Sequence, residues 1–519
     1  MAVAMNMKDL VKKAALGLYA FVLVFVGIIL FGGDQILFFA NSFTGTVDVH
    51  GSAEALTIAY AQSPQSLNPT QFDAVTRSRL VNVYEGLVRT DRNLKIEPAV
   101  AVAWGLLDPK TWEFKLRPHV LFHNGIEVKA SDVVASLQKA KDDPDSQLKN
   151  LLNSIADVKS VDDLTVRVTT KVPDPLLLNK LAVTYIFPKD YATFDSPIGT
   201  GPYQFVSRDR DVITFQRFAN YWGDEPYFGK LTLKTLQDRD ERIAALRSGA
   251  VDILADVPPS AAKNLESADL VMKSVPSLEV SFIMLNTQTG VFQDKVLREA
   301  AAYALDRQQF VEIANGYAQP IRQFVSSGVF GFNPSLKGYD FDIKKAQSTA
   351  EPVTSQSFEQ LAVTLDYAEG NDVIAQYVQD QFKQFGVDVV LNPLSGQDFQ
   401  EKLQSGTSEM YYLGWRSELG DANDFLQSVA HSRDSNGFAG QYNGTNYANV
   451  QADQLIDESQ QNLQVKSRLK SMQDAMKILV EDDIAGIPLF ETQTIFAFKK
   501  NLQFEPRVDG YIYAAEIKK

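Results

Sequence analysis

Apolar and polar positions downstream of residue 54 follow two periods, one typical of strands and one typical of helices. Residues 56–60 (LTIAY) form a short apolar strand, and residues 164–169 alternate apolar and polar side chains as a half-buried strand does. Residues 73–88 (DAVTRSRLVNVYEGLV) instead repeat apolar side chains at helical spacing. The pattern therefore predicts a protein of the α/β class.

The two periods alternate more regularly between residues 361 and 415. Strands are predicted at 361–367, 387–394 and 408–415, and helices between them at 371–385 and 397–404. Strand–helix–strand units of this kind build parallel sheets with right-handed crossovers. We therefore expect a parallel sheet whose third strand ends at Gly414 and Trp415.

An acidic motif follows this strand directly. In LGWRSELGDANDF (413–425), Trp415 is followed by Glu418, Asp421 and Asp424. Ligands of open α/β sheets bind outside the carboxyl ends of the strands, so the motif is placed to line a ligand crevice. Packing of Trp415 in a core is the alternative for the aromatic side chain.

The three carboxylates have different alternatives. Asp421 or Asn423 would cap a helix that contains Phe425, and Asp424 would favour the positive end of its dipole. We assign Asp424 to that helix and leave Asp421 open between cap and ligand contact. Glu418 precedes the turn and is expected to face a cation. A calcium loop is excluded, because D-A-N-D-F lacks the alternating acids and the glycine of such loops.

The N-terminal 40 residues differ from the rest of the chain. Lys8, Lys12 and Lys13 precede an uncharged, mainly apolar stretch at residues 14–33. Such a segment (1–40) is either a long signal peptide or an uncleaved membrane anchor, followed by a small, polar tether at 41–53. In both cases we expect the remaining chain outside the cytoplasm, in the periplasm or on the outer face of the cell membrane.

The net charge and the composition limit the kinds of partner and cofactor that the protein is expected to bind. The formal net charge is −14, so a phosphate backbone would be repelled and nucleic acid is not expected. The absence of cysteine excludes disulfides, thiolate catalysis and Cys-ligated zinc. The four histidines have no metal-binding spacing, so neither a metal nor a cofactor is expected. The Gly199 and Gly201 pair lacks the rest of a nucleotide-binding fingerprint and is assigned to a structural turn.

No catalytic motif accompanies the acidic cluster. A G-x-S-x-G nucleophile elbow is absent from the sequence. Glu418 and Asp421, three residues apart, do not obviously face each other across a cleft as the acid/base pair of a glycosidase does. A binding protein is therefore favoured over an enzyme. An exported glycan- or peptide-acting enzyme and a membrane-tethered sensor with the same binding fold remain alternatives.

Several stretches resemble one family. Residues 112–137 (WEFKLRPHVLFHNGIEVKASDVVASL) are similar to the W-x-F-x-L-R-x-x-V-x-F-x-(D/N)-G signature of extracytoplasmic solute-binding proteins of the dipeptide/oligopeptide/nickel class, bacterial family 5. Shorter matches follow in the family's order, namely IGTGPYQFV (198–206), NYWGDEPYF (220–228), LRSGAVDIL (246–254) and the motif at 413–425. Each match is short, and it is their order, from about residue 55 to 500, that makes the set specific.

The resemblance implies a bilobed clamshell of the class II type that serves an ABC importer. The first lobe would comprise residues 54–285 with an inserted subdomain at about 101–190, and the second lobe residues 286–489. Residues 490–519 would return to the first lobe. Two chain crossings would form the hinge, and closure would bury the ligand. The implied partners are a peptide and the transmembrane permease subunits, and the implied state is a monomer.

The resemblance also implies roles within the motif. Gly414 and Trp415 would contribute backbone hydrogen bonds to an extended peptide, and Trp415 an apolar wall. The family's Asp three residues after the Trp binds the α-ammonium, and Glu418 stands at that position. Asp421 is a second candidate for the ammonium, and Arg416, on the opposite face of the strand, is a further candidate contact. Peptide is favoured over nickel, haem or sugar, which stay open as ligands.

Overall fold

The computed structural model describes residues 54–191, 193–262, 265, 267, 269–355, 360–434, 437 and 439–519. The predicted N-terminal segment (1–40) and tether (41–53) lie outside these residues. The fold described below is that of the unit Ala55–Lys519. Among the described residues, no helix is both long enough and apolar enough to cross a membrane.

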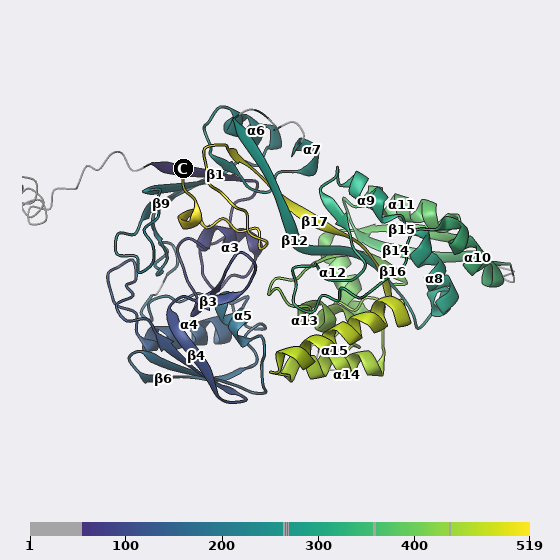
Figure 1. Cartoon of the computed structure of the whole chain (residues 1–519), viewed down its shortest axis with the longest axis horizontal. Coiled ribbons are helices and arrows are strands. Elements are labelled where there is room, and N and C mark those ends of the chain that lie inside the picture. The colour runs from purple at the N-terminus through teal and green to yellow at the C-terminus, as the bar shows by residue number, and fades with distance from the viewer. Residues whose placement is uncertain are drawn as a thin grey trace, which may run out of the picture. The chain divides into compact units, whose positions relative to one another are not determined.

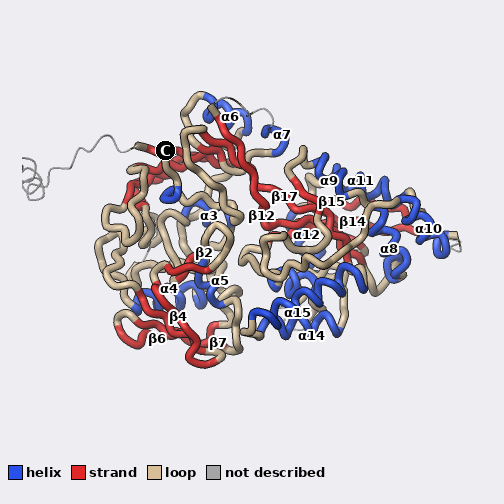
Figure 2. Tube along the Cα trace, viewed as in Figure 1, coloured by secondary structure: helices blue, strands red, loops and turns tan. Residues whose placement is uncertain are grey.

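Eleven of the described strands form one sheet, in the order β15, β14, β16, β12, β17, β11, β1, β10, β9 and β8, with β13 paired to β17 (Figure 2). Their bounds are β1 Ala55–Tyr60, β8 Tyr203–Asp209, β9 Val212–Arg217, β10 Lys230–Thr235, β11 Ile253–Leu254, β12 Leu270–Leu285, β13 Ala318–Pro320, β14 Leu361–Ala368, β15 Val387–Leu394, β16 Met410–Arg416 and β17 Gly486–Lys499. The long strands β12 and β17 run side by side through the middle of the sheet (Figure 1).

The sheet is mixed, which corrects the parallel sheet expected from the alternation of strands and helices. The strand β14 pairs in parallel with both β15 and β16, as predicted. On its other side, however, β16 pairs antiparallel with β12, and β12 pairs antiparallel with β17. These partners lie far apart in the sequence, and periodicity within a strand carries no information about the direction of such a neighbour.

Two smaller antiparallel sheets lie in the first half of the chain. One pairs β2 (Val88–Thr90) with β3 (Ile96–Pro98). The other has the order β4, β5, β7, β6, with bounds β4 Ala101–Asp108, β5 Thr111–Leu116, β6 Ile155–Asp162 and β7 Thr165–Thr170.

Helices flank the sheets (Figure 1). Their bounds are α3 Ala74–Leu80, α4 Ala130–Asp142, α5 Leu177–Ala182, α6 Arg239–Arg247, α7 Pro259–Ala262, α8 Lys295–Ala304, α9 Arg307–Ile313, α10 Ile343–Thr354, α11 Asp372–Lys383, α12 Gly396–Ser405, α13 Asn423–Phe425, α14 Val450–Gln461 and α15 Val465–Lys477. Aliphatic and aromatic side chains of α8, α9 and α11 pack on β14 and β15, and α15 packs on the core that contains Phe425.

Separate hydrophobic cores form at the two ends of the long strands β12 and β17. One contains Leu56, Leu231 and Ile512, so the C-terminal residues pack against the first strand. A second core, built around Phe114, fills the space between α4 and the β4–β7 sheet. Further cores lie around Leu365 and Phe425, from the second half of the chain. A buried core stabilises its part of the chain because it removes apolar surface from water.

The helix predicted over residues 73–88 is shorter in the structure. The helix α3 begins after Asp73, whose side chain accepts a hydrogen bond from Thr76 N, and ends at Leu80. Beyond it, the Asn82 amide donates to Ile512 O at 2.9 Å and accepts from Ala514 N at 2.7 Å. These contacts with the C-terminal segment take the place of further helical turns. The apolar residues between 83 and 87 therefore lie in a packed loop and not in a helix.

The Gly199 and Gly201 turn is structural, as predicted. Gly201 N donates to Val83 O at 2.9 Å. A Cβ atom on Gly199 would lie 2.1 Å from Val83 O, which is backbone and cannot turn away. The two glycines therefore allow the loop to approach the chain after α3 closely.

Gly199→Ala is expected to lower the free energy of unfolding by about 1–3 kcal/mol, because an overpacked site forces the backbone to shift. Chemical denaturation followed by tryptophan fluorescence measures the loss. Gly105→Ala is the control, since a Cβ there meets no atom within 4 Å. Equal stability of the two variants would contradict the close approach.

Candidate functional site

The strand β16 places the motif at an edge that is only partly paired. Gly414 pairs with Ser281 of β12, and Trp415 pairs with Val280. On the other side, β14 pairs with β16 only at Met410 and Tyr411. The last residues of β16 therefore have a strand neighbour on one edge, and Gly414 is exposed.

Trp415 is half-buried and packs at the margin of a core, which is the alternative considered for it. Its ring packs on Tyr442 with a centroid distance of 5.6 Å, at the margin of the core that contains Phe425. Its indole nitrogen is buried and makes no hydrogen bond of good geometry. The same indole faces the Asp424 carboxyl and lowers its pKa. Trp415 thus joins the core to the acidic side chains.

Glu418 lies between two guanidinium groups. Its carboxylate is 3.0 Å from Arg416 Nε and 3.6 Å from Arg77 Nη1. Arg77, from α3, is 5% exposed and lies between the rings of Phe72 and Tyr511, at 4.8 and 5.1 Å from their centroids. Glu418 therefore connects the end of β16 with α3. Arg77 was not among the predicted site residues, because nothing in its helical spacing points to β16.

Arg416 faces away from Trp415, as its position on the strand predicts. Its Nη2 donates to Asp509 O at 2.5 Å. Arg416 thus ties the strand end and Glu418 to the C-terminal segment.

Asp421 has a structural partner. Both oxygens of its carboxylate accept hydrogen bonds from Arg468 of α15, at 2.7 and 2.8 Å. Both side chains are buried, and Asp421 also accepts from Asn423 N at 3.0 Å. Neither Asp421 nor Asn423 caps the helix as predicted, because the N-cap of α13 is Ala422 and no side chain accepts a capping hydrogen bond there. Asp421 is instead held by Arg468, a partner that sequence spacing did not indicate.

Asp424 lies in the first turn of α13, as predicted, but α13 spans only three residues. Asp424 is one of the residues that line a cavity of about 560 Å³. Burial and the neighbouring Glu418 and Asp421 charges raise the pKa of Asp424 to about 7. A carboxyl group that the sequence assigned to a helix dipole is therefore also part of a cavity wall.

This cavity is lined from two distant stretches of the chain. Its lining residues are Phe72, Gln147, Asn150, Leu151, Asn153, Leu176, Lys180, Leu419, Asn423, Asp424, Gln427, Ser428, Gly437 and Gln441. Asn179 of α5 donates to Leu419 O at 3.0 Å and holds the two stretches together at the rim. Its volume lies within the range of about 300–1,000 Å³ that is usual for small-molecule sites.

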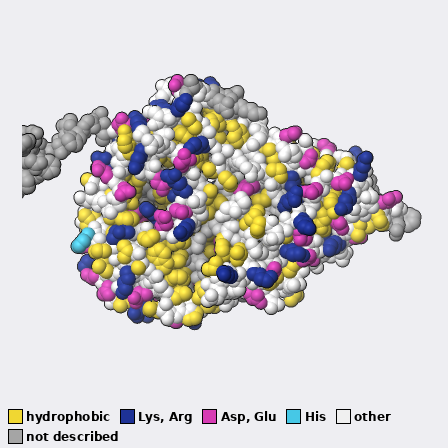
Figure 3. All heavy atoms as spheres, viewed as in Figure 1, with side chains coloured by type: hydrophobic (Ala, Val, Ile, Leu, Met, Phe, Trp, Pro, Cys, Tyr) yellow, Lys and Arg dark blue, Asp and Glu magenta, His cyan; other side chains and the backbone are white. Residues whose placement is uncertain are grey.

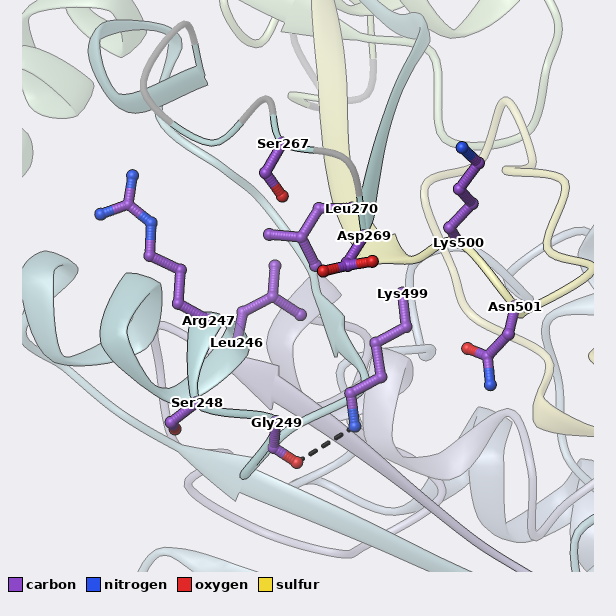
Figure 4. A pocket seen from close by; sticks show the side chains of 10 residues that line it. All are labelled: Leu246, Arg247, Ser248, Gly249, Ser267, Asp269, Leu270, Lys499, Lys500 and Asn501. Atoms are coloured by element: carbon purple, nitrogen blue, oxygen red, sulfur yellow. Dashed lines mark hydrogen bonds between the residues drawn. The ribbon is translucent and has the colours of Figure 1, made fainter.

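The structure contains two further pockets of interest, and one of them includes Arg416 of the motif. A pocket of about 290 Å³ is lined by Arg79, Asp256, Arg416 and Tyr511, among others. A third, of about 590 Å³, lies at the ends of α6 and β17 and contains none of the predicted residues (Figure 4). Lys499 in that pocket donates to Gly249 O at 3.1 Å and pairs with Asp252 at 2.6 Å.

The charges around the site do not form a field of one sign. On the face shown in Figure 3, basic and acidic side chains are interspersed. Within the described part of the chain, no group of three or more His, Cys, Asp and Glu side chains is arranged to hold a metal ion.

Comparison with protein-family models decides the family. The model of the bacterial extracellular solute-binding proteins, family 5, matches residues 95–437. The chain belongs to this family. As a family 5 member it is the substrate-binding component of an ABC importer and is not an enzyme, as the resemblance in its motifs predicted.

Relatives and solved structures cover most of this family 5 chain. The glutathione-binding protein GsiB of Salmonella typhimurium is 28% identical over 462 residues, which are 85% of this chain and 88% of that protein. The periplasmic binding protein DppA of Helicobacter pylori, in complex with the peptide STSA, has a TM-score of 0.71 at 23% identity, covering 89% of this chain and 96% of that one. NikZ of Campylobacter jejuni, in complex with Ni(L-His), has a TM-score of 0.72 at 21% identity, covering 90% and 100%.

Proposed function

We propose that this family 5 protein captures short peptides in a cleft between two lobes and delivers them to the permease subunits of its importer. The observation that carries the proposal is the place of Glu418. It follows the partly paired end of β16, contacts Arg77 of the opposite side, and adjoins a cavity whose wall includes Leu419. GsiB is named as a glutathione-binding protein, and the structure of DppA contains a bound peptide. These two relatives make peptide the favoured ligand class.

The proposed lobes comprise residues 54–285, with the inserted subdomain at about 101–190, and residues 286–489, with 490–519 returning to the first lobe. The separate hydrophobic cores support this division. The strands β12 and β17 end near residues 285 and 499 and span from one set of cores to the other, so they are candidates for the two crossings of the hinge. Closure of the lobes would then bury a peptide.

Glu418 is proposed to bind the α-ammonium of the peptide. Its distance of 3.6 Å from Arg77 Nη1 exceeds that of a hydrogen bond, and its side chain is 27% exposed. The carboxylate therefore keeps acceptor capacity for a ligand. The ammonium would replace Arg77 as its partner, while Arg416 holds the other oxygen at 3.0 Å.

The remaining motif residues have supporting roles in this proposal. Gly414 and Trp415 would offer the unpaired edge of β16 to the peptide backbone. Arg416 would orient Glu418, and Asp421, held by Arg468, would fix the loop that carries Glu418. A direct contact of Asp421 with the ammonium would require Arg468 to leave a buried pair.

The proposal places the protein outside the cytoplasm as a monomer, held by residues 1–40 if that segment is an anchor or released if it is a signal peptide. Native mass spectrometry of the purified protein tests the ligand class. Recurring short peptides among the co-purifying molecules would support the proposal, and a bound glycan or nickel complex would overturn the peptide assignment.

Glu418→Gln is expected to weaken binding of peptides with a free N-terminus by about 10- to 100-fold, the usual value of a charge-assisted hydrogen bond of about 1.5–3 kcal/mol. Binding of the N-acetylated peptides is expected to change little. Isothermal titration calorimetry measures both. Glu225→Gln is the control, because it removes an exposed pair with Arg217 far from the motif. Unchanged affinity of the free peptides would exclude Glu418 as the ammonium partner.

A further inference from the structure

Asp424 differs from the two acidic residues that precede it in the motif. Glu418 is held by Arg416 and Arg77, and Asp421 by Arg468. In the part of the chain that the structure describes, Asp424 forms no ion pair. Its carboxyl lies against the Glu418 backbone N–H and the Trp415 indole, and Asp424 lines the cavity of about 560 Å³. This cavity therefore contains a carboxyl group without a cation.

The groups around Asp424 make this position electrostatically unfavourable for a carboxylate. Glu418 faces it from the loop after β16, and Asp421, neutralised by Arg468 of α15, from its own loop. Lys180 of α5 lines the same cavity, but its ammonium is paired with Asp174 at 2.7 Å. Burial and the two carboxylates raise the pKa of Asp424 to about 7. A cation that entered the cavity would relieve both effects.

The remaining cavity wall combines apolar residues, among them Phe72 and Leu419, with uncharged polar residues and Lys180. Six of the lining residues carry side-chain amides, namely Gln147, Asn150, Asn153, Asn423, Gln427 and Gln441. Two of these amides already accept hydrogen bonds within the protein, Asn423 from Ser459 and Gln147 from Phe72 N. Amides both donate and accept hydrogen bonds, as peptide groups do. Lys180, already paired, is the other charged side chain among the described lining residues. The wall thus suits a molecule with one cationic group and an otherwise neutral, hydrogen-bonding body.

We propose that Asp424 is a second binding residue for the ligand's cation, so that the α-ammonium of a short, otherwise uncharged peptide lies at the margin of this cavity, between Asp424 in its wall and Glu418 beside it. The inference rests on the proposed function and adds a residue and a preference to it. Peptides that carry a carboxylate next to the ammonium would be disfavoured, because that group would meet the same two acids. Trp415, which touches the carboxyl, acts as the positioning residue for Asp424.

The test compares Asp424→Asn with the unchanged protein, using an equimolar library of uncharged tripeptides with free N-termini and its N-acetylated counterpart. Competition binding followed by native mass spectrometry at pH 8 measures both. Asp424→Asn is expected to lower the affinity for the free-amine library about 10- to 100-fold and to change the affinity for the N-acetylated library less than about twofold. Equal loss for both libraries would indicate a structural defect and overturn the proposal.

The pH profile supplies a readout that a structural role would not change. An ammonium binds the ionised carboxyl, so the affinity of the unchanged protein for the free-amine library is expected to fall about tenfold for each pH unit below 7. The profile of Asp424→Asn is expected to be flat over the same range. A slope that persists in the variant would overturn the role of Asp424.

Failure of this inference is distinguishable from failure of the proposed function. If Asp424→Asn binds both libraries like the unchanged protein while Glu418→Gln loses the free-amine library, the peptide function stands and Asp424 is not a ligand residue. If the unchanged protein binds neither library, the peptide function and the inference that rests on it are both overturned.

Discussion

Arg468→Met is expected to lower the free energy of unfolding by about 3–5 kcal/mol, because it leaves the Asp421 carboxylate buried without a counter-charge. The two side chains are about 95% buried and share two hydrogen bonds of 2.7 and 2.8 Å. Arg468 Nε also donates to Ser459 O at 2.9 Å, and the guanidinium lies 5.3 Å from the Phe330 ring. Thermal unfolding by circular dichroism is expected to shift down by about 4–8 °C.

Lys470→Met is the matched control for this loss. Lys470 lies on the same helix and forms an exposed pair with Asp474 at 2.6 Å. Exposed pairs of this kind contribute at most about 0.5 kcal/mol. In the double variant Asp421→Asn, Arg468→Met, the unpaired charge is absent, so the loss is expected to be smaller than the sum of the two single losses. A loss in Arg468→Met no larger than that in Lys470→Met would contradict the buried pair.

Asp424→Asn is expected to stabilise the ligand-free protein at pH 8 by about 2–4 kcal/mol and to have no stabilising effect at pH 4. The folded protein holds the pKa of this carboxyl at about 7, above its ordinary value. The folded state therefore binds the proton more tightly than the unfolded state does. Stability is lost as the pH rises from about 4 to about 7, where the carboxyl ionises, and is constant above. Solvent that enters the partly open cavity screens the charge of the Asp424 carboxylate. The expected stabilisation therefore lies toward the lower end of the 2–4 kcal/mol range, at about 2 kcal/mol.

Urea denaturation at pH 4, 6 and 8, without ligand, measures this gain. A gain at pH 8 that disappears at pH 4, together with the loss of peptide binding described above, would identify Asp424 as a residue kept for binding at the expense of stability. Equal midpoints for the variant and the unchanged protein at pH 8 would contradict the raised pKa.

The local elements, and the position of the acidic motif directly after a strand, could be predicted from the sequence. The apolar run at 56–60 is β1, and the alternation of strand and helix between residues 361 and 415 corresponds to β14, α11, β15, α12 and β16. The spacing of the motif placed Trp415 and Arg416 on opposite faces of the strand. These features depend on burial of side chains a few residues apart, which the two periods encode directly.

The partners of the acidic side chains could not be predicted in this way. Asp421 meets Arg468, 47 residues later, and Glu418 meets Arg77, more than 300 residues earlier. The same limit applies to the end of α3, which contacts with Ile512 and Ala514 determine.

The sequence by itself therefore determined an α/β chain with family 5 motifs, no cysteine, and a strand that ends in an aromatic and acidic motif. Only the tertiary structure decided that the sheet is mixed, that Asp421 is neutralised in a buried pair, and that Asp424 lines a cavity. The physical reason is that periodicity reports whether a position is buried. The charge that meets a buried carboxylate depends on which distant segments the fold brings together.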